Sequence, residues 1–99
     1  MKTFANKLKE LRLNKELLLR QVAAAIEVDT SMVSKFESGE RFPTREQIEK
    51  LATFFKVPEE DFLVEAFSDK LSYDLGEDPL ATEILKQTIV KLKSINSKE

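Results

Sequence analysis

The chain has 99 residues, of which 41% are hydrophobic, and this size suits one small domain with a modest core. It contains neither cysteine nor histidine, so it lacks the residues for a disulfide, a thiolate metal site and the commonest general base. We therefore expect no cofactor, no metal site and no enzymatic activity. Because no apolar run approaches membrane-spanning length, we also expect a cytoplasmic protein without a membrane span.

The helical spacing of apolar residues predicts an all-α protein, since glycine and proline are few and no window alternates as a strand does. The first expected helix follows the cap residue Thr3 and runs to about Asn14, and the second ends at Ile26. Ala23 is small enough to lie where this second helix crosses the next one, although alanine is also simply a good helix former. The inward-facing positions of both helices are Phe4, Leu8, Leu11, Val22, Ala23 and Ile26.

The segment between Asp29 and Gly39 reads as a short helix with one apolar face. Asp29 is a good N-cap residue, and Gly39 can take the left-handed conformation that ends a helix. Val33 and Phe36 are three residues apart and can face inward. The outward positions then offer hydroxyl groups and one ammonium, which suit base edges and phosphates, from Thr30, Ser31, Ser34 and Lys35. An ordinary solvated helix would carry similar residues, so this segment alone does not establish DNA binding.

The net charge of −2 is divided unevenly along the chain. Residues 1–45 carry nine Lys and Arg against six Asp and Glu, whereas residues 46–99 carry seven against twelve. A basic first half and an acidic second half suit a protein that approaches DNA in one orientation. A random scatter of charges is the alternative explanation.

Two further helices are expected between residues 44 and 76. Thr44 and Gln47 have the spacing of a capping box, and the helix that they begin runs to about Lys56. Pro58 lies in the first turn of the next helix, where proline is tolerated, and Gly76 ends it. The apolar stripe of these two helices comprises Ile48, Leu51, Ala52, Phe55, Phe62, Leu63, Ala66, Phe67, Leu71 and Leu75.

A last amphipathic helix is expected after the pair Asp78-Pro79, which has the order of a cap and a first-turn proline. Its stripe is more apolar than a lone terminal helix should leave in water, so we expect it to be covered. We favour dimerisation, through Phe67, Leu71, Ile84, Leu85, Ile89 and Leu92. The alternatives are that this helix caps the preceding domain or binds another protein.

Together, the motifs fall at a characteristic spacing, with matching positions at Leu8, Arg12, Val22, Ala23, Ile26, Val28, Val33, Ser34, Glu37, Gly39, Pro43, Leu51, Ala52 and Val57. This set resembles the Cro/C1-type helix-turn-helix family, also called the Xre family, over residues 4–63. The resemblance implies a five-helix, lambda-repressor-like DNA-binding domain over residues 1–63, followed by a helical extension over residues 64–99. It also implies binding to double-stranded operator DNA, usually as a dimer on an inverted repeat.

The resemblance also assigns roles to individual residues. The base-reading residues would be Thr30, Ser31 and Lys35, with Met32 and Ser34 as secondary candidates. Arg12 and Glu37 match positions that form a structural ion pair. Where family members carry Ser or Thr followed by a phosphate-binding Gln, this chain has Leu18 and Leu19. The phosphate candidates are therefore Arg20, Gln21, Arg41 and Arg45, although Arg41 and Arg45 can equally be solvated surface residues.

A second departure from the family pattern is Glu27, which stands where a glycine usually ends the second helix. The turn there must either hold a non-glycine residue in the left-handed conformation or take another form. As function, we expect a homodimeric transcriptional repressor of the kind that controls restriction-modification or mobile-element genes. The alternative is an antitoxin-like protein-binding module that regulates its own gene through the same helix-turn-helix.

Overall fold

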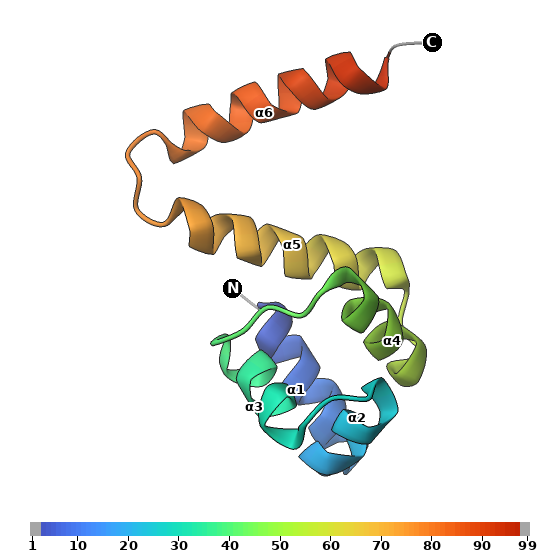
Figure 1. Cartoon of the computed structure of the whole chain (residues 1–99). Coiled ribbons are helices and arrows are strands. Elements are labelled where there is room, and N and C mark those ends of the chain that lie inside the picture. The colour runs from blue at the N-terminus through green and yellow to red at the C-terminus, as the bar shows by residue number, and fades with distance from the viewer. Residues whose placement is uncertain (1–2, 98–99) are drawn as a thin grey trace.

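The computed structural model describes residues 3–97, which form six α-helices. In chain order these are α1 (Phe4–Asn14), α2 (Leu19–Ile26), α3 (Thr30–Ser38), α4 (Arg45–Phe55), α5 (Glu59–Leu75) and α6 (Ala81–Asn96). The all-α fold predicted from apolar spacing is confirmed. Helices α1 and α4 pack against α5, α2 and α3 pack against each other and against α4 and α1 respectively, and α6 lies on the far side of α5 (Figure 1).

Residues 3–66, which we call the head, enclose the core. Phe4 of α1 meets Phe62 of α5 edge to face, with ring centroids 5.0 Å apart, and so fastens the first helix to the fifth. Among the described residues, the buried apolar side chains all lie in the head and come from each of its five helices: Phe4, Leu8, Val22, Ala23, Ile26, Val33, Phe36, Ile48, Leu51, Ala52, Phe55, Phe62, Leu63 and Ala66. This core holds α2 and α3 in a fixed mutual orientation.

The helix starts are stabilised by side chains that bind the first free backbone N–H groups. Thr3 Oγ1 accepts from the backbone N–H of Asn6 at 3.2 Å, and Thr44 Oγ1 accepts from that of Gln47 at 3.2 Å. In both cases the later side chain accepts in return from the cap residue's own N–H. Asp29 occupies the cap of α3, but its carboxylate makes no capping hydrogen bond, so the prediction of a side-chain cap there is wrong.

The helix ends explain how this chain tolerates its departure from the family pattern. Gly39 ends α3 with φ 80°, as predicted from the sequence. Glu27 ends α2 in the same left-handed region, with φ 59° and ψ 47°, and the following Val28 N–H donates to Ala23 O at 3.0 Å. The family turn is therefore kept, at a conformational cost of about 1 to 2 kcal/mol for a residue with a Cβ.

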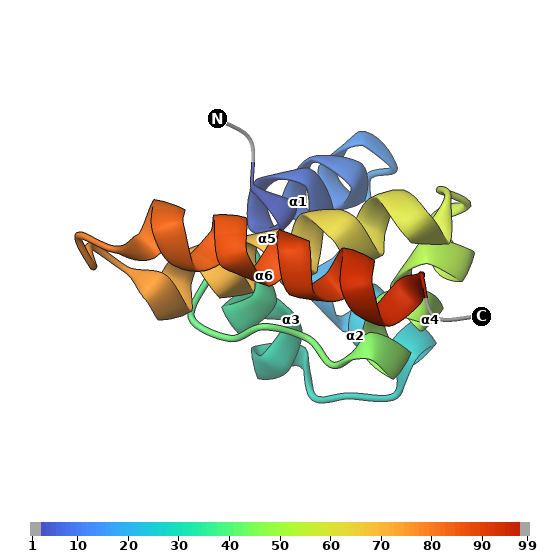
Figure 2. The ribbon, with the colours of Figure 1, turned by 90° about the horizontal axis from the view of Figure 1, so that it is seen from above.

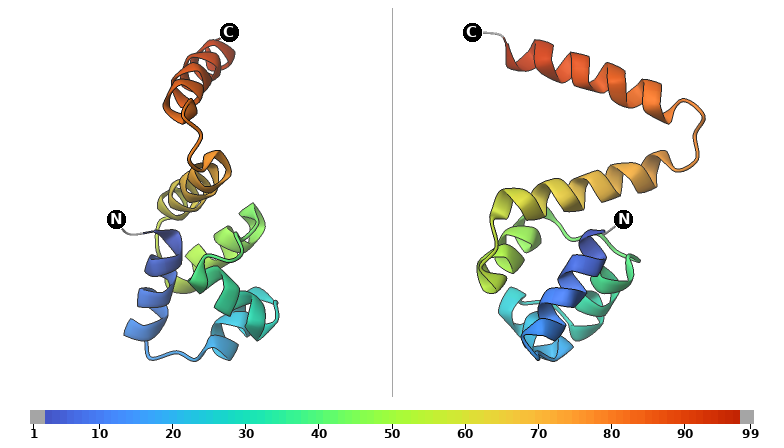
Figure 3. Two further views of the ribbon diagram at one scale, coloured as in Figure 1. Left: turned by 90° about the vertical axis from the view of Figure 1, so that its left-hand side faces the viewer. Right: turned by 180° about the vertical axis from the view of Figure 1, so that it is seen from behind.

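Helix α5 does not present the single apolar stripe expected from the sequence. Phe62, Leu63 and Ala66 are buried against the head, but Phe67 and Leu71 are 39% and 53% exposed. Successive residues turn by about 100° along a helix, so the two groups point in different directions. Figure 3 shows why they differ, because α5 has the head on one side and α6 standing clear on the other.

Helix α6 begins at Ala81, later than the pair Asp78-Pro79 that was expected to start it. These two residues form a turn instead, in which Asp78 Oδ1 accepts from Leu80 N–H at 2.8 Å. The aspartate therefore caps the turn rather than the helix. We call residues 67–97, from the outer half of α5 to the end of the described chain, the tail.

Candidate nucleic-acid interface

Helix α3 is anchored to the head by its apolar residues and leaves a polar face in water. Val33 and Phe36 are 0% and 2% exposed, and the helix packs against both α1 and α2. The exposed side chains gather within a little under half of the helix circumference and comprise Thr30, Ser31, Ser34, Lys35 and Ser38. A helix held in this way can enter a DNA major groove without disturbing the core.

The structure separates the two secondary base-reading candidates. Ser34 is exposed on the polar face of α3, whereas Met32 is half-buried and packs against the core. Ser38, which the sequence analysis left out, lies on the same face, and its hydroxyl donates to Lys35 O at 3.1 Å. Four of the five expected base-reading residues therefore share one exposed surface, and Met32 contributes mainly to packing.

The phosphate candidates at the start of α2 are exposed, but one of them has a local role as well. Gln21 Oε1 accepts from Leu18 N–H at 2.7 Å, which closes the first turn of α2 and leaves the amide NH₂ free to donate. Arg20 is exposed beside it. Leu18, which replaces a polar residue of the family pattern, is 50% exposed and offers no hydrogen bond to a phosphate.

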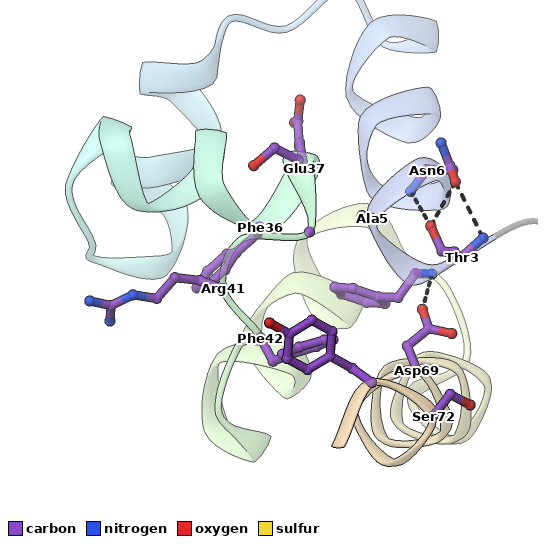
Figure 4. Close-up of a pocket in the computed structure, with 13 residues that line it drawn as sticks. Thr3, Ala5, Asn6, Phe36, Glu37, Arg41, Phe42, Asp69 and Ser72 are labelled. Atoms are coloured by element: carbon purple, nitrogen blue, oxygen red, sulfur yellow. Dashed lines mark hydrogen bonds between the residues drawn. The ribbon is translucent and has the colours of Figure 1, made fainter. Parts of the chain in front are cut away.

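The two arginines after α3 are also exposed, and they differ in their surroundings. Arg45 Nε lies 3.4 Å from Glu49 Oε2, one turn along α4, and both side chains are well exposed. Arg41 extends away from the body of the protein in Figure 4. An exposed pair such as Arg45–Glu49 contributes little to stability, so it does not hold Arg45 firmly in place.

On the side of α3 that faces α1, Arg12 and Glu37 form a bidentate salt bridge. Arg12 Nε and Nη2 donate to the two carboxylate oxygens of Glu37 at 2.7 and 3.0 Å, and Arg12 Nη1 donates to Leu17 O at 2.9 Å. The side chains are 12% and 7% exposed. Hydrogen bonding to Glu37 raises the pKa of Arg12 above its usual range, so the pair stays charged and ties α1 to the end of α3.

A cleft of about 470 Å³ lies beside this pair, between the start of α1, the end of α3, the loop after α3 and the C-terminal half of α5 (Figure 4). At its floor, Phe4 N–H donates to Asp69 Oδ2 at 2.6 Å. At its rim, the rings of Phe42 and Tyr73 lie 5.7 Å apart. These contacts orient α5, and with it the tail, relative to α3. Sequence reasoning missed Asp69, although it lies three residues after the buried Ala66.

The residues expected to form a dimer interface are all exposed. Phe67 and Leu71 lie on α5, while Ile84, Leu85, Ile89 and Leu92 lie on α6 and are between 39% and 52% exposed. None of the residues of α6 is fully buried. Within the described part of the chain, no helix combines the length and apolar character that a membrane crossing requires.

The family model for the helix-turn-helix matches residues 8–62, which is more than half of the chain. The chain therefore belongs to the Cro/C1-type helix-turn-helix family of DNA-binding transcriptional regulators. The matched region includes the ion pair between Arg12 and Glu37 and the whole of α3.

Three curated proteins are similar to part of the chain. The HTH-type transcriptional activator BcrR of Enterococcus faecalis is 35% identical over 60 residues, which are 61% of this chain and 29% of that protein. The cryptic phage CTXphi transcriptional repressor RstR of Vibrio cholerae is 36% identical over 55 residues, 56% of this chain and 50% of that protein. The regulator RghRB of Bacillus subtilis is 36% identical over 67 residues, 67% of this chain and 48% of that protein. The chain thus matches half the length of these relatives or less.

A solved structure resembles the whole fold, including the tail. A chain of the SinR protein/SinI protein complex superimposes with a TM-score of 0.56 at 19% sequence identity, over 97% of this chain and all of the other. At this identity the likeness concerns the fold alone, which is lambda-repressor-like with a helical extension.

Proposed function

We propose that this protein is a homodimeric transcriptional repressor that binds an inverted-repeat operator. Residues 1–63 would form the DNA-binding domain and residues 64–99 the dimerisation extension. The observation that carries the proposal is the polar face of α3, which is exposed while Val33 and Phe36 fix the helix to the core. A DNA-binding regulator of this kind works in the cytoplasm of the bacteria that carry its relatives.

In this proposal the exposed residues of α3 read base edges. Thr30 and Ser31 lie in the first turn, which in a helix-turn-helix points into the major groove, and Lys35 follows one turn later. A lysine can donate to the acceptors of guanine, and a threonine methyl group can contact thymine. The surrounding phosphates would be bound by Arg20, Gln21, Arg41 and Arg45.

A dimer supplies the affinity that a single head lacks. The basic half of the sequence has a net charge of only +3, so one copy neutralises few phosphates. Two copies related by a twofold axis double these contacts and place their recognition helices about 34 Å apart, one turn of DNA. The exposed apolar side chains of the tail are the surface available for that pairing.

The resemblance to RstR, which is named as a repressor of a cryptic phage, favours a mobile-element gene as the target. A restriction-modification gene is the other target that we propose. An activating role is also represented among the relatives, by BcrR. We favour repression because a compact dimer bound at an operator blocks polymerase without any further contact.

A protein-binding role for the tail, as in an antitoxin that regulates its own gene, is the second candidate. It is favoured by the exposed apolar side chains of α6, and the solved structure that shares the fold comes from a complex of two proteins. In this case the tail would be covered by a different protein and the head would bind DNA as before.

The proposal is tested by selecting bound sequences from random duplex DNA. We expect the purified chain to enrich an inverted repeat whose half-sites are centred about 10 base pairs apart, and a variant with Thr30→Ala and Ser31→Ala to lose the enrichment. The variant Lys9→Ala, exposed on α1 and outside both α3 and the tail, serves as the matched control and should enrich the same repeat. Selection of no sequence, or of a single half-site by a monomer, would refute the proposal.

A further inference from the structure

Helix α5 has a second apolar side, which does not face the core and which we call its outer side. Val64, Phe67 and Leu71 recur at three- and four-residue spacing and are 68%, 39% and 53% exposed. At about 100° per residue, their direction is roughly opposite to that of the buried Phe62 and Ala66. Helix α5 is therefore a two-sided helix, with one side on the core and the other available for another helix.

Helix α6 presents a matching stripe. Leu85, Thr88, Leu92 and Ile95 follow the alternating three- and four-residue spacing of helices that pack side by side. Thr88 would place a hydroxyl in the middle of an apolar contact, but that hydroxyl already donates to Ile84 O at 2.7 Å. Its hydrogen bond is satisfied within the helix, so burying Thr88 strands no polar group.

The two helices carry opposite charges. Helix α5 has six Asp and Glu and one Lys, whereas α6 has three Lys and one Glu. Helical spacing places Glu60 and Asp74 beside the apolar stripe of α5. It places Lys91 beside the apolar stripe of α6. Two copies of α6 placed against each other would bring like charges together, whereas α6 placed against α5 brings opposite charges together.

The loop between these helices keeps them apart within one chain. Gly76 has φ 54° and ψ −129°, a conformation that a residue with a side chain rarely adopts, and Asp78 holds the rest of the loop through Leu80 N–H. In Figures 1 and 3 the two helices diverge from this loop, and Figure 2 shows α6 passing above α5 and the head. The exposure of both apolar stripes agrees with this open arrangement.

We propose that two copies of the chain pair reciprocally, with α6 of each copy packed against the outer side of α5 of its partner. This rests on the proposed function, which makes the tail a dimer interface, and it adds which helix meets which. The exposed stripe of α5 is covered by α6 of a second copy, because α6 is complementary to α5 in both apolar spacing and charge. Within one chain, the loop between the two helices holds α6 away from α5. Each contact then occurs twice, as a twofold axis requires.

The test exchanges the charges of the two helices. In one variant, Lys91 is replaced by Glu; in the other, Glu60 and Asp74 are replaced by Lys. At low salt we expect each variant alone to dimerise at least about tenfold more weakly than the unmodified chain, and an equal mixture to recover dimers. Lys9→Glu, on the head, is the matched control and should not change dimerisation.

Each outcome of this experiment decides between the arrangements. If α6 met α6, reversing the charge on α6 would again place like charges opposite each other, so each variant alone would dimerise as well as the unmodified chain. That result would overturn the inference while leaving the tail dimer intact. A monomeric unmodified chain in sedimentation would overturn the proposed dimer itself. A circular-dichroism melt shows whether each variant is folded.

A second measurement covers the case in which a charge variant unfolds. Because the chain has no cysteine, single cysteines can be introduced without background. We expect Leu71→Cys and Ile89→Cys chains, mixed and treated with a short bismaleimide, to cross-link to each other more than either does to itself. Preferential Ile89→Cys self-linking, or linking within a chain that carries both cysteines, would refute reciprocal pairing.

Discussion

The ion pair between Arg12 and Glu37 allows a quantitative prediction about stability. Replacing Glu37 by Ala leaves the guanidinium of Arg12 with Leu17 O as its remaining protein acceptor. The side chains of Arg12 and Glu37 are only 12% and 7% exposed, so water cannot fully replace the lost carboxylate. We expect the free energy of unfolding to fall by about 3 to 5 kcal/mol.

This loss is measurable by thermal and urea unfolding followed by circular dichroism. For a domain of this size it lowers the melting temperature by at least about 12 °C. The matched control is Glu65→Ala, which removes a more exposed pair with Lys7 at 3.0 Å and should cost less than about 1 kcal/mol. Replacing both members of the buried pair, as Arg12→Met with Glu37→Leu, should restore most of the stability because no charge is stranded.

Two results would refute this reasoning. One is a cost for Glu37→Ala no larger than that of the exposed control. The other is a double variant no more stable than the single one.

The contribution of Arg12 to stability should not vary with pH near neutrality, since the pKa of Arg12 is raised on folding. The stabilisation is present below the pKa of Arg12 in the unfolded chain, and it is lost only in strong alkali, as pH rises through the pKa of Arg12 in the folded chain.

Three further predictions address the interface, the tail and the turn. In fluorescence anisotropy, Ser31→Ala should weaken operator binding more than random-DNA binding, whereas Arg41→Ala should weaken both alike and reduce the salt slope by about one; equal losses for Ser31→Ala would exclude base reading. Ile84→Asp with Leu92→Asp should give monomers in sedimentation, and a dimeric variant would remove α6 from the interface. Glu27→Gly should raise the free energy of unfolding by up to about 1 kcal/mol by relieving the left-handed residue, whereas Glu27→Ala should not; equal effects would contradict the strain.

Most of the fold was predictable because local signals agree with the tertiary structure. The capping pairs at Thr3 and Thr44 act within one turn, and so does the glycine that ends α3. The burial of Val33 and Phe36 follows from their spacing once the segment is taken as a helix. The same spacing accounts for the exposure of the polar side chains of α3, on which the proposed DNA contacts depend.

Other features could not be read from local patterns. Phe67 and Leu71 continue the spacing of the buried residues of α5 closely enough to suggest one stripe, and only the position of the head shows that they face away from it. Met32 is an apolar residue of α3, and whether its side chain packs against the core or faces DNA depends on the neighbouring helices. The hydrogen bond from Phe4 N–H to Asp69 joins residues far apart in the chain.

The sequence by itself determined which segments are helices, where α1, α3 and α4 begin and end, and which surface of α3 is polar, because caps, glycines and apolar spacing act over one or two turns. Tertiary structure alone decided how α5 is shared between the core and an open apolar side, and how far α6 stands from it. Those features depend on contacts between distant residues and on the geometry of the loop at Gly76 and Asp78. Local periodicity shows that a face is apolar, but only packing shows what lies against it.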